Sequence, residues 1–394
     1  MTKIPVLQLK PGREKSVVNR HPWIFSGGVA HAANAKEGDI VEVQTTKKEA
    51  LGYGFYSIES QISCRMFDWG KQPKDFEQEA YWMEKLQQAY ALRKQLVITD
   101  TTNSYRLVHA EGDFLPGLIA DVYKDVLVVQ FLIEGIYQRK DLFIRCFEQL
   151  GFTTIYQRSS GSSRNQQDVK AEEGWIKGKS DATIEILENG QKFKVNVVEG
   201  QKTGFFLDQR DNRQLIKSVS AGKTVLNAFS YTGGFSVYAA AGGAKEVHSL
   251  DISAEAVTLS EENVTSNYPT VLHKGIAKDC FAYLREMPAD FYDLIILDPP
   301  AFAKNKGSVD RAARGYKDIN LVAIKKIKPG GLLATFSCSQ HISKDLFQKI
   351  VFGAAADAGR NVQIIHQLHQ PADHPVNIFH PEGEYLKGLM VWGE

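Results

Sequence analysis

Cysteine is scarce in this sequence, and no two cysteines lie close together along the chain. Among 394 residues there are four, at Cys64, Cys146, Cys280 and Cys338. The absence of any Cys-x-x-Cys pair excludes a zinc ribbon and a thioredoxin-type motif, and a disulfide framework is not expected at this length. Such usage is typical of a reducing compartment, so we expect a cytoplasmic protein.

The sequence also has almost no net charge and no long apolar run. Lys and Arg total 47 against 46 for Asp and Glu, a net charge of +1. This balance excludes binding to nucleic acid through bulk charge, although a local basic patch is still allowed. No run of about 18 apolar residues occurs, and the N-terminus MTKIPVLQLKPGREK lacks the apolar core of a signal peptide. We therefore expect a soluble protein with no membrane partner.

The composition, with 43% hydrophobic and 24% charged residues, is that of a globular protein. At roughly 150 residues per domain, the length predicts two or three domains. Short apolar runs between turn signals predict a small β-barrel at residues 1–75. A helix at residues 76–96, mixed helix and strand patterns and a polar loop at SSGSSRNQQDVKAEEGW predict a small central α+β domain at residues 76–190. A third domain then covers residues 191–394.

Strands and helices alternate strictly after Gly222. Continuous apolar strands in such an alternation indicate a parallel sheet with helices on both faces; they are TVLNAF, EVHSLDI, VLHKGIA, YDLIILDPP and GLLATFSCS. A helix is predicted between the last two of these strands, at YKDINLVAIKKIKPGG. The final strands, VQIIHQLHQ and YLKGLMVW, have no helix between them, which is typical of the antiparallel hairpin that ends a methyltransferase sheet. The predicted fold class is α/β, with a Rossmann-like domain after two smaller domains.

Open parallel sheets bind ligands beyond the carboxyl ends of their strands, where this sequence has Asn227, Asp251, Asp279, Asp298 and Cys338. The first turn, SYTGGF, lacks the G-x-G-x-x-G spacing of a dinucleotide site, while Gly233 lets the backbone approach a ligand closely. Asp251, 18 residues after Gly233, is spaced to accept both ribose hydroxyls, and Asp279 or its amide can read an adenine amino group. A nucleoside without pyrophosphate is implied, which predicts S-adenosyl-L-methionine as the cofactor. Each Asp taken alone also fits a helix N-cap.

The sequence Asp298-Pro299-Pro300 follows the fourth strand, beside the expected position of the methyl sulfonium. The prolines fix the backbone, so that the Asp298 carboxylate can bind a ring nitrogen or an exocyclic amine of a planar base. Phe302 is placed to stack on that base. In the alternative interpretation, the two prolines simply terminate a buried strand.

Cys338 ends the fifth strand, next to Asp298 in any ordering that pairs strands four and five. A thiolate that adds to carbon 6 of a pyrimidine makes carbon 5 nucleophilic enough to accept a methyl group. The thiol starts near a pKa of about 8.5, so its surroundings must favour the thiolate. A lone Cys in an apolar strand is otherwise a buried small hydrophobe. Its position among Ser337, Ser339 and Gln340 favours the nucleophile, and we interpret the other three cysteines as structural.

Basic residues are concentrated after the Asp298 turn. Between positions 301 and 328, two Asp residues oppose eight basic residues: Lys304, Lys306, Arg311, Arg314, Lys317, Lys325, Lys326 and Lys328. This excess predicts a nucleic-acid substrate, bound by residues such as Lys304 and Arg314. His374, in a Pro-bounded loop, is a further candidate for substrate contact. We expect no metal, because His366 and His369, three residues apart, would lie on opposite faces of a strand.

Several segments share their motifs with one known family. They include NAFSYTGGFSVYAAAGGAKEVHSLDIS, LDPPAFAKNK, RGYKDIN, TFSCSQHISKDLFQKI, QPADHPV and PEGEYLKG. Together they resemble the RlmI (YccW-like) family of class I S-adenosylmethionine-dependent 23S rRNA cytosine-5 methyltransferases. GREKSVVNRHPWIFSGGV followed by GDIVEV is similar to the PUA domain of that family, an RNA-binding β-barrel. RLVHAEGDFLPGLIADVY is similar to its central α+β domain, so the resemblance covers essentially the whole chain.

The resemblance implies that the chain makes 5-methylcytosine in large-subunit rRNA, with Cys338 as the nucleophile and Asp298 as the acid that contacts the base beside the cofactor. It implies cofactor contacts from Phe229, Tyr231, Gly233, Asp251 and Asp279, and Phe206 and Gln209 in GFFLDQR are further candidates. Many cytosine-5 RNA methyltransferases carry a second Cys after the DPP-like turn, where this chain has Ala301-Phe302. The group that removes the carbon 5 proton is therefore unassigned.

Three alternatives stay open from the sequence. Uridine enzymes also combine a DPP turn with a fifth-strand Cys, so uracil carbon 5 is one alternative target. A base nitrogen, gripped by the Asp298 turn with Cys338 idle, is the second. A non-catalytic RNA-binding ribosome assembly factor is the third. The oligomeric state, a homodimer included, is also open.

Overall fold

The computed structural model describes residues 4–72, 74–158, 173–303 and 305–394. The chain forms two compact units. Unit 1 contains Met1–Ile186, Val195–Leu207 and Ala372–Gly383, and unit 2 contains Leu187–Lys194, Asp208–Pro371 and Glu384–Glu394. Lys304 and most of the predicted polar loop lie outside the described residues. The predicted division into three domains at residues 75 and 190 stays a prediction.

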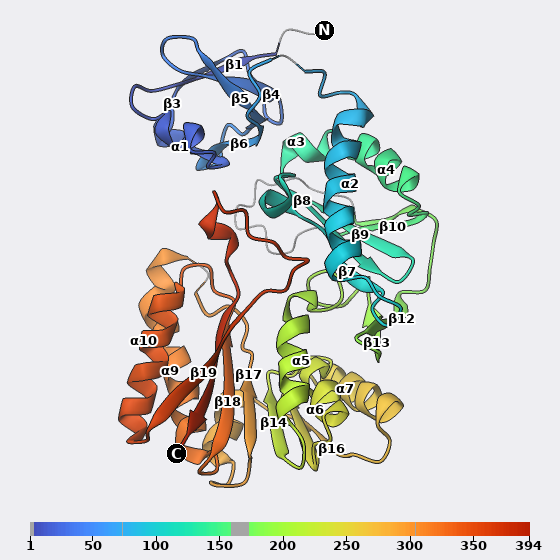
Figure 1. Ribbon diagram of the computed structural model, residues 1–394, viewed down its shortest axis with the longest axis vertical. Coiled ribbons are helices and arrows are strands. Elements are labelled where there is room, and N and C mark those ends of the chain that lie inside the picture. Colours follow the sequence, from blue (N-terminus) through green and yellow to red (C-terminus); the bar gives the residue numbers. More distant parts are fainter. Residues whose placement is uncertain (1–3, 73, 159–172, 304) are drawn as a thin grey trace. The chain divides into compact units, whose positions relative to one another are not determined.

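The first sheet of unit 1 has six strands in the order β2-β6-β5-β4-β1-β3 (Figure 1). Its elements are β1 (Val6–Leu9), α1 (Lys15–Val18), β2 (Trp23–Phe25), β3 (Val29–Ala33), β4 (Ile40–Gln44), β5 (Ala50–Tyr56) and β6 (Ile62–Asp68). Alternate residues of these strands, such as Leu7, Leu9, Val41 and Val43, point into one apolar cluster. The strands predicted for the first 75 residues are therefore confirmed.

The second sheet of unit 1 has the order β11-β10-β9-β8-β7. Its strands are β7 (Ser104–His109), β8 (Leu118–Tyr123), β9 (Val126–Phe131), β10 (Thr154–Gln157) and β11 (Gly174–Lys177). Unit 1 also contains the helices α2 (Glu79–Leu96), α3 (Glu134–Tyr137) and α4 (Lys140–Gln149). The side chains of Trp82 and Phe143, from α2 and α4, join the buried cluster of this sheet. Two further strands, β12 (Thr183–Glu188) and β13 (Gln191–Asn196), pair with each other.

The sheet of unit 2 has seven strands in the order β16-β15-β14-β17-β18-β20-β19. The strands are β14 (Thr224–Ala228), β15 (Glu246–Asp251), β16 (Leu272–Ala277), β17 (Leu294–Leu297), β18 (Gly331–Ser337), β19 (Val362–His369) and β20 (Lys387–Gly393). The pairs from β16 to β18 are parallel, whereas β20 runs antiparallel to both β18 and β19. The predicted parallel sheet and its closing antiparallel pair are confirmed.

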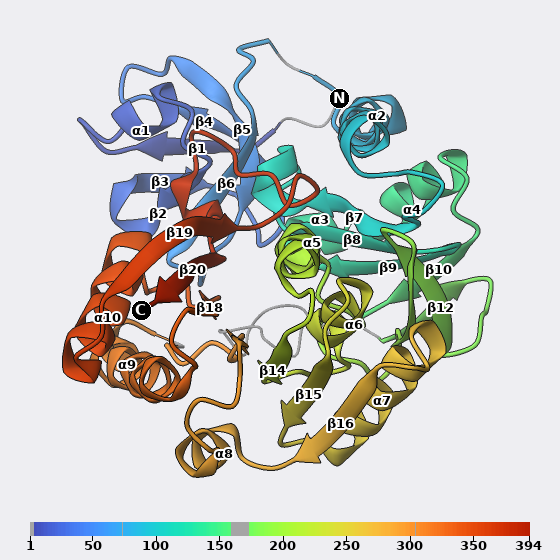
Figure 2. The same ribbon diagram turned by 60° about the horizontal axis from the view of Figure 1, so that its bottom comes forward.

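Helices cover both faces of this sheet, as Figure 2 shows. They are α5 (Arg210–Val219), α6 (Gly234–Ala241), α7 (Ala254–Asn267), α8 (Cys280–Glu286), α9 (Val309–Lys326) and α10 (Lys344–Ala358). All four residues of β17 are buried because successive side chains enter opposite clusters. Ile295 and Leu297 pack in the cluster that includes α8, α9 and α10, while Leu294 and Ile296 pack in the one that includes α5 and α6.

Element boundaries differ from the predictions at two helices. The helix predicted at residues 76–96 begins at Glu79, and the helix predicted from Tyr316 begins at Val309. Helix α9 begins earlier than predicted because Ala312 and Tyr316 both pack into the core, and this packing stabilises a helical conformation of the polar sequence VDRAARG. Among the described residues, no helix is long and apolar enough to cross a membrane.

Candidate active site

The carboxyl ends of neighbouring strands form the centre of the candidate site in unit 2. Ala228 of β14 lies opposite Leu297 of β17, and Leu297 lies opposite Thr335 of β18. Parallel strands end at the same edge of a sheet, so the residues that follow these three strands are brought to one edge. The predicted pairing of the fourth and fifth strands is confirmed, and with it the adjacency of the Asp298 turn and Cys338.

The turn after β14 has an unusual backbone conformation. Phe229, Tyr231 and Gly233 have positive φ angles of 60°, 46° and 79°. Bulky residues rarely adopt this conformation, and such residues concentrate at ligand sites. Asp251 stabilises the turn, because its carboxylate accepts the backbone N–H of Tyr231 at 2.9 Å and that of Ser253 at 3.0 Å. The remaining lone pairs of this carboxylate can accept ribose hydroxyls.

Asp279 caps a helix, which is the alternative role that the sequence left open. Its Oδ1 accepts the backbone N–H of Ala282 at 2.8 Å at the start of α8. Because the cap uses Oδ1, capping and a ligand contact through Oδ2 are compatible. The side chain is exposed, and its contact with an adenine stays a prediction.

Two buried oxygens near the β14 turn have no hydrogen-bond donor among the described residues. They are Oδ1 of Asn227, which is 1% exposed, and Oγ of Ser230. The amide nitrogen of Asn227 is used internally, since it donates to Ser236 at 2.9 Å. Buried acceptors without donors are uncommon in folded proteins, and a bound nucleoside with hydroxyl and amino groups could satisfy them. The residues at this edge therefore fit such a cofactor.

Gly233 is required for packing. A Cβ at this position would lie 2.7 Å from Cβ of Ser260 and 3.0 Å from its Cα. Glycine is the residue that combines this approach with a φ of 79° at no steric cost. The close approach is to α7, which gives the glycine a reason independent of any ligand, and its predicted contact with a cofactor stays a prediction.

Cys338 differs from the other cysteines in exposure. Cys64, Cys146 and Cys280 are buried, whereas Cys338 is partly exposed. Burial raises the pKa of Cys146 to about 11 and that of Cys280 to about 12, so both are thiols at neutral pH. Sγ of Cys338 lies 4.0 Å from the carbonyl oxygen of Pro299. The structure thus brings the predicted nucleophile into contact with the Asp298-Pro299-Pro300 turn.

Buried polar contacts fix the chain that follows Cys338. Oγ of Ser339 accepts the backbone N–H of Ala303 at 3.1 Å and lies 2.9 Å from the hydroxyl of Tyr316. Ser339 is fully buried. The cysteine is therefore held between the turn after β17 and helix α9 by groups that are distant in the sequence.

Lys387 is absent from the sequence-based predictions and belongs to this site. It begins β20, is 4% exposed, and lies opposite Ser337 of β18. Its ammonium donates to the carbonyl of Ser339 at 2.7 Å and to that of Ile342 at 2.8 Å. The signal in the sequence is a single Lys inside the apolar strand YLKGLMVW, since a lysine is almost never fully buried unless it is paired.

Aromatic rings connect the two turns of the site. The ring centroid of Phe302 lies 5.8 Å from that of Phe281 and 4.5 Å from that of Tyr316. Phe281 in turn lies 6.2 Å from Phe229 in the β14 turn. Phe302 is thus half-buried among protein rings, and its stacking on a substrate base stays a prediction.

The basic cluster after the Asp298 turn is smaller than the sequence count. Lys317 and Lys328 form ion pairs with carboxylates, and Lys326 donates to two backbone carbonyls. Lys304 lies outside the described residues. The basic residues that are exposed in η4 (Lys306–Ser308) and α9 are Lys306, Arg311, Arg314 and Lys325.

Three other predicted residues, Phe206, Gln209 and His374, are divided between the two units. Gln209 is buried at the start of α5 in unit 2, while Phe206 and His374 belong to unit 1. The ammonium of Lys202 lies 4.3 Å from the ring centroid of Phe206. His374 is 2% exposed, with Nδ1 3.1 Å from the Asp373 carboxylate. Their cofactor and substrate contacts stay predictions. No group of three or more His, Cys, Asp or Glu in the described part of the chain is placed to bind a metal.

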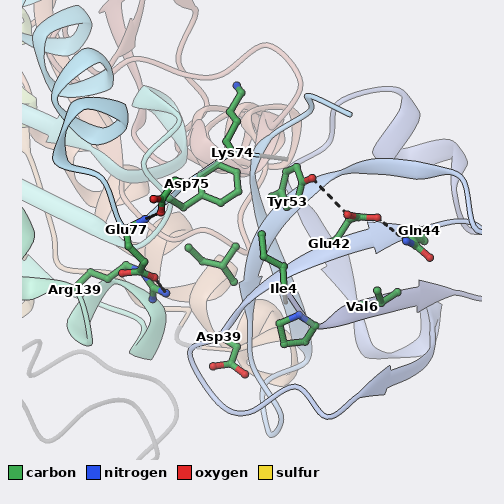
Figure 3. Close-up of a pocket in the computed structure, with 13 residues that line it drawn as sticks. Ile4, Val6, Asp39, Glu42, Gln44, Tyr53, Lys74, Asp75, Glu77 and Arg139 are labelled. Atoms are coloured by element: carbon green, nitrogen blue, oxygen red, sulfur yellow. Dashed lines mark hydrogen bonds and ion pairs between the residues drawn. The ribbon is translucent and has the colours of Figure 1, made fainter. Parts of the chain in front are cut away.

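Unit 1 contains a separate cavity of about 690 Å³ (Figure 3). Figure 3 shows Tyr53 directed toward Glu42, to which its hydroxyl donates, and Arg139 beside Glu77, with which it forms an ion pair at 2.7 Å. The predicted site residues are not among the residues that line this cavity. The edge of the unit 2 sheet is therefore the candidate active site.

Comparison with known proteins identifies the family. Residues 105–383 match the S-adenosylmethionine-dependent methyltransferase family, and residues 7–69 match a PUA-like domain. Ribosomal RNA large subunit methyltransferase I of Shewanella denitrificans is 42% identical to this chain, over 98% of this chain and 99% of that protein. The protein of the same name from Aeromonas salmonicida is also 42% identical, over 98% of each chain. The chain belongs to the ribosomal RNA large subunit methyltransferase I family.

Solved structures of methyltransferases agree with this family. A crystal structure of a methyltransferase in complex with SAH aligns with a TM-score of 0.85 at 25% identity, over 99% of this chain and 100% of that one. An S-adenosylmethionine-dependent methyltransferase from Streptococcus mutans has the same fold, with a TM-score of 0.82 at 24% identity, over 99% and 100% of the two chains. The predicted family, the Rossmann-like fold with an N-terminal PUA-like domain, and the cofactor S-adenosyl-L-methionine are confirmed.

Proposed function

We propose that this methyltransferase modifies carbon 5 of a cytosine in large-subunit rRNA through a covalent adduct at Cys338. The contact between Cys338 and the Asp298-Pro299-Pro300 turn carries the proposal, because it joins a partly exposed thiol to an acid that can bind the base. The relatives named ribosomal RNA large subunit methyltransferase I support the choice of RNA. The exposed basic residues of η4 and α9 supply charges for its phosphates.

The proposed reaction begins when the Cys338 thiolate adds to carbon 6 of the pyrimidine, forming a sulfur–carbon bond and shifting an electron pair to carbon 5. Asp298 hydrogen-bonds a ring nitrogen or the exocyclic amine and holds the base in place. When bound, the cofactor would supply an electrophilic methyl group on a sulfonium, and its sulfur would keep the electron pair of the broken sulfur–carbon bond as a neutral thioether. After carbon 5 has been methylated, a base removes its proton, the double bond reforms, and the Cys338 thiolate leaves. The chain thus recovers its starting state.

The cofactor is proposed to lie along the ends of β14, β15 and β16. Asp251 would accept the ribose hydroxyls with the lone pairs that the turn does not use, and Asp279 would contact the adenine through Oδ2. Phe229 and Tyr231, in their left-handed conformations, would border the nucleoside. Asp298, at the end of β17, lies between this region and Cys338.

The decisive variant is Cys338→Ala, measured with rRNA and labelled cofactor. We expect at least a thousandfold loss of methyl transfer with unchanged cofactor affinity by calorimetry, because the nucleophile is removed without touching the cofactor site. Cys146→Ala is the matched control and should stay active. An rRNA with 5-fluorocytosine at the target should form a covalent adduct with the wild-type chain and none with Cys338→Ala. A fully active Cys338→Ala enzyme would refute the mechanism.

Methylation of a base nitrogen is the second candidate, because the Asp298-Pro299-Pro300 turn is also suited to grip an exocyclic amine. Nucleoside mass spectrometry of rRNA from a strain without the gene separates the candidates. Loss of 5-methylcytidine supports the first, loss of 5-methyluridine moves the target to uracil, and loss of an N-methyl nucleoside supports the second. An unchanged nucleoside pattern, with no cofactor binding, would favour a non-catalytic RNA-binding assembly factor.

The organisation around this activity is also proposed. The PUA-like segment binds the RNA, and the chain divides near residues 75 and 190 into an RNA-binding, a central and a catalytic domain, as limited proteolysis would show. We propose a cytoplasmic location, which fractionation of cells tests. Light scattering at several protein concentrations decides between a monomer and a homodimer.

A further inference from the structure

The most unusual charge in unit 2 is the ammonium of Lys387. Its side chain is 4% exposed at the start of β20, a strand that lies in the interior of the sheet between β18 and β19. Burying a charge is unfavourable unless hydrogen bonds and an opposite charge compensate it. The site therefore raises the question of which anion accompanies this cation.

Two carbonyls satisfy part of the hydrogen-bonding capacity of Lys387. They belong to Ser339 at 2.7 Å and Ile342 at 2.8 Å, and the backbone N–H of Ile342 also donates to the carbonyl of Ser339 at 3.1 Å. Lys387 thus closes a small turn that begins directly after Cys338. An ammonium has three N–H donors. The two carbonyls accept two of them, but carbonyls are neutral, so the positive charge and one donor are left for another group.

No carboxylate among the described residues forms an ion pair with Lys387. Burial lowers the pKa of this lysine to about 8, while Cys338 and the exposed Glu384 act in the opposite direction. Of the other titratable groups near this turn, His369 lies opposite Lys387 on β19 and contacts the Gln370 carbonyl. Tyr316 contacts the turn through Ser339, and burial raises its pKa, so it is neutral.

We propose that Lys387 is a positioning residue that holds the turn after Cys338 and stabilises the Cys338 thiolate by its charge. The inference rests on the proposed role of Cys338 as nucleophile. Coulombic coupling is mutual: a thiolate that favours the ammonium is itself favoured by the ammonium to the same extent. When the thiol is ionised, the ammonium of Lys387 and the thiolate of Cys338 attract each other. When the thiol is protonated, this attraction is absent. The two backbone hydrogen bonds fix the distance at which this coupling acts.

The same contacts explain why the charge comes from β20. Lys387 lies opposite Ser337, the last residue of β18, so its side chain reaches past the strand end to the cysteine turn. A cation on an exposed loop would be screened by solvent, whereas a fixed cation in a water-poor site acts strongly on a neighbouring charge. Lysine is suited to this position because a compact ammonium can donate to two carbonyls at once.

The test measures the thiol directly, by alkylating the full-length chain with iodoacetamide between pH 5.5 and 9.5 and quantifying the Cys338 peptide by mass spectrometry. Cys146 and Cys280 have raised pKa values and serve as slow internal references. We expect an apparent pKa for Cys338 below the usual value of about 8.5. In Lys387→Gln it should rise by about one unit, which corresponds to roughly tenfold slower alkylation at pH 7. Gln keeps a donor for the carbonyls but removes the charge.

Two further variants separate charge from folding. Lys326→Met is the matched control, since Lys326 also donates to two backbone carbonyls, those of Arg285 and Met287, and should leave Cys338 unchanged. Lys387→Arg keeps the charge and should restore most of the reactivity. If Lys387→Gln does not fold, as judged by thermal melting and cofactor binding, the wild-type profile still decides, because an apparent Cys338 pKa at or above about 8.5 overturns the inference. A Cys338 profile that is the same in wild type and Lys387→Gln overturns the inference.

This readout is independent of catalysis. If Cys338→Ala stays active in methyl transfer, the proposed nucleophile fails, yet the alkylation profile still shows whether Lys387 tunes the thiol. If Cys338→Ala is inactive and Lys387→Gln has a normal profile and normal single-turnover rate, the proposed function stands and the role of Lys387 is rejected.

Discussion

The two halves of the sheet edge in unit 2 are built in different ways. The proposed cofactor half, at the ends of β14, β15 and β16, is built from backbone: a turn at residues 229–233 with positive φ angles, in which the Tyr231 N–H donates to Asp251. The cysteine half, at the ends of β17, β18 and β20, is built from buried side chains. Ser339, Tyr316 and Lys387 fix the chain next to Cys338. A nucleoside can be recognised by a shaped backbone, whereas a reactive thiol needs fixed charges and donors around it.

The largest effect on cofactor affinity should come from removing Asp251, the acid that holds the turn of the proposed cofactor half. Asp251→Ala loses the proposed ribose contacts and releases the Tyr231 N–H, so we expect cofactor affinity to fall about a hundredfold, a change of about 2.7 kcal/mol. Calorimetry measures the affinity, and alkylation of Cys338 should be unchanged because the two halves are separate. Glu255→Ala, an exposed acid in the first turn of α7, is the control and should bind normally. An unchanged cofactor affinity in Asp251→Ala would show that Asp251 does not contact the cofactor.

The same comparison explains what the sequence predicts and what it does not. The places of Asn227, Gly233 and Asp251 at the sheet edge were predictable because their features are local: a strand end, a glycine turn and an acid at a fixed spacing. The fold was predictable for the same reason, since continuous apolar strands alternate with helices. The contact of Lys387 with the turn after Cys338 was not predictable, because Lys387 follows Cys338 by nearly fifty residues and reaches this turn only through the antiparallel pairing of β20 with β18. Likewise, the ion pairs of Lys317 and Lys328 reduce a basic cluster that the sequence overstates.

Removing the Ser339 hydroxyl should disturb the cysteine half and leave the cofactor half unchanged. Ser339→Ala leaves the buried Ala303 N–H without its acceptor, which costs about 1–3 kcal/mol of stability. Since the turn next to Cys338 loosens, we expect single-turnover methyl transfer to slow about tenfold with cofactor affinity unchanged. Ser343→Ala removes the N-cap of α10 and should cost about 1 kcal/mol without slowing the reaction. Equal rates in the two variants would show that Ser339 matters for folding only.

Two glycine variants test whether the cofactor half depends on the close packing of its turn against α7. Gly233→Ala places a Cβ against Ser260 at a φ of 79°, whereas Gly222→Ala has a similar φ of 70° but open space. Both variants bear the left-handed strain of about 1 kcal/mol, so their difference isolates the contact with α7. We expect about fivefold weaker cofactor binding in Gly233→Ala than in Gly222→Ala, measured by calorimetry. Equal affinities would mean that the turn adapts without disturbing the site.

The smallest expected effect is a pH dependence confined to the cysteine half. Burial lowers the pKa of Lys387 to about 8, so the ammonium persists below that pH and its charge is lost above it. The severalfold faster methyl transfer of the wild type over Lys387→Gln should therefore disappear between pH 8 and 9, where the Cys338 thiol ionises without the ammonium, while cofactor affinity stays level. Stability has the opposite sign: the folded pKa lies below the unfolded value of about 10.4, so the unfolded chain binds more protons and this group adds stability as pH rises from 8 to 10. A loss of this rate difference that coincides with a gain in stability cannot be caused by unfolding. Single-turnover rates and thermal melts of the two proteins at matched pH give both quantities. A rate ratio that stays the same at every pH would show that the charge of Lys387 does not act on Cys338.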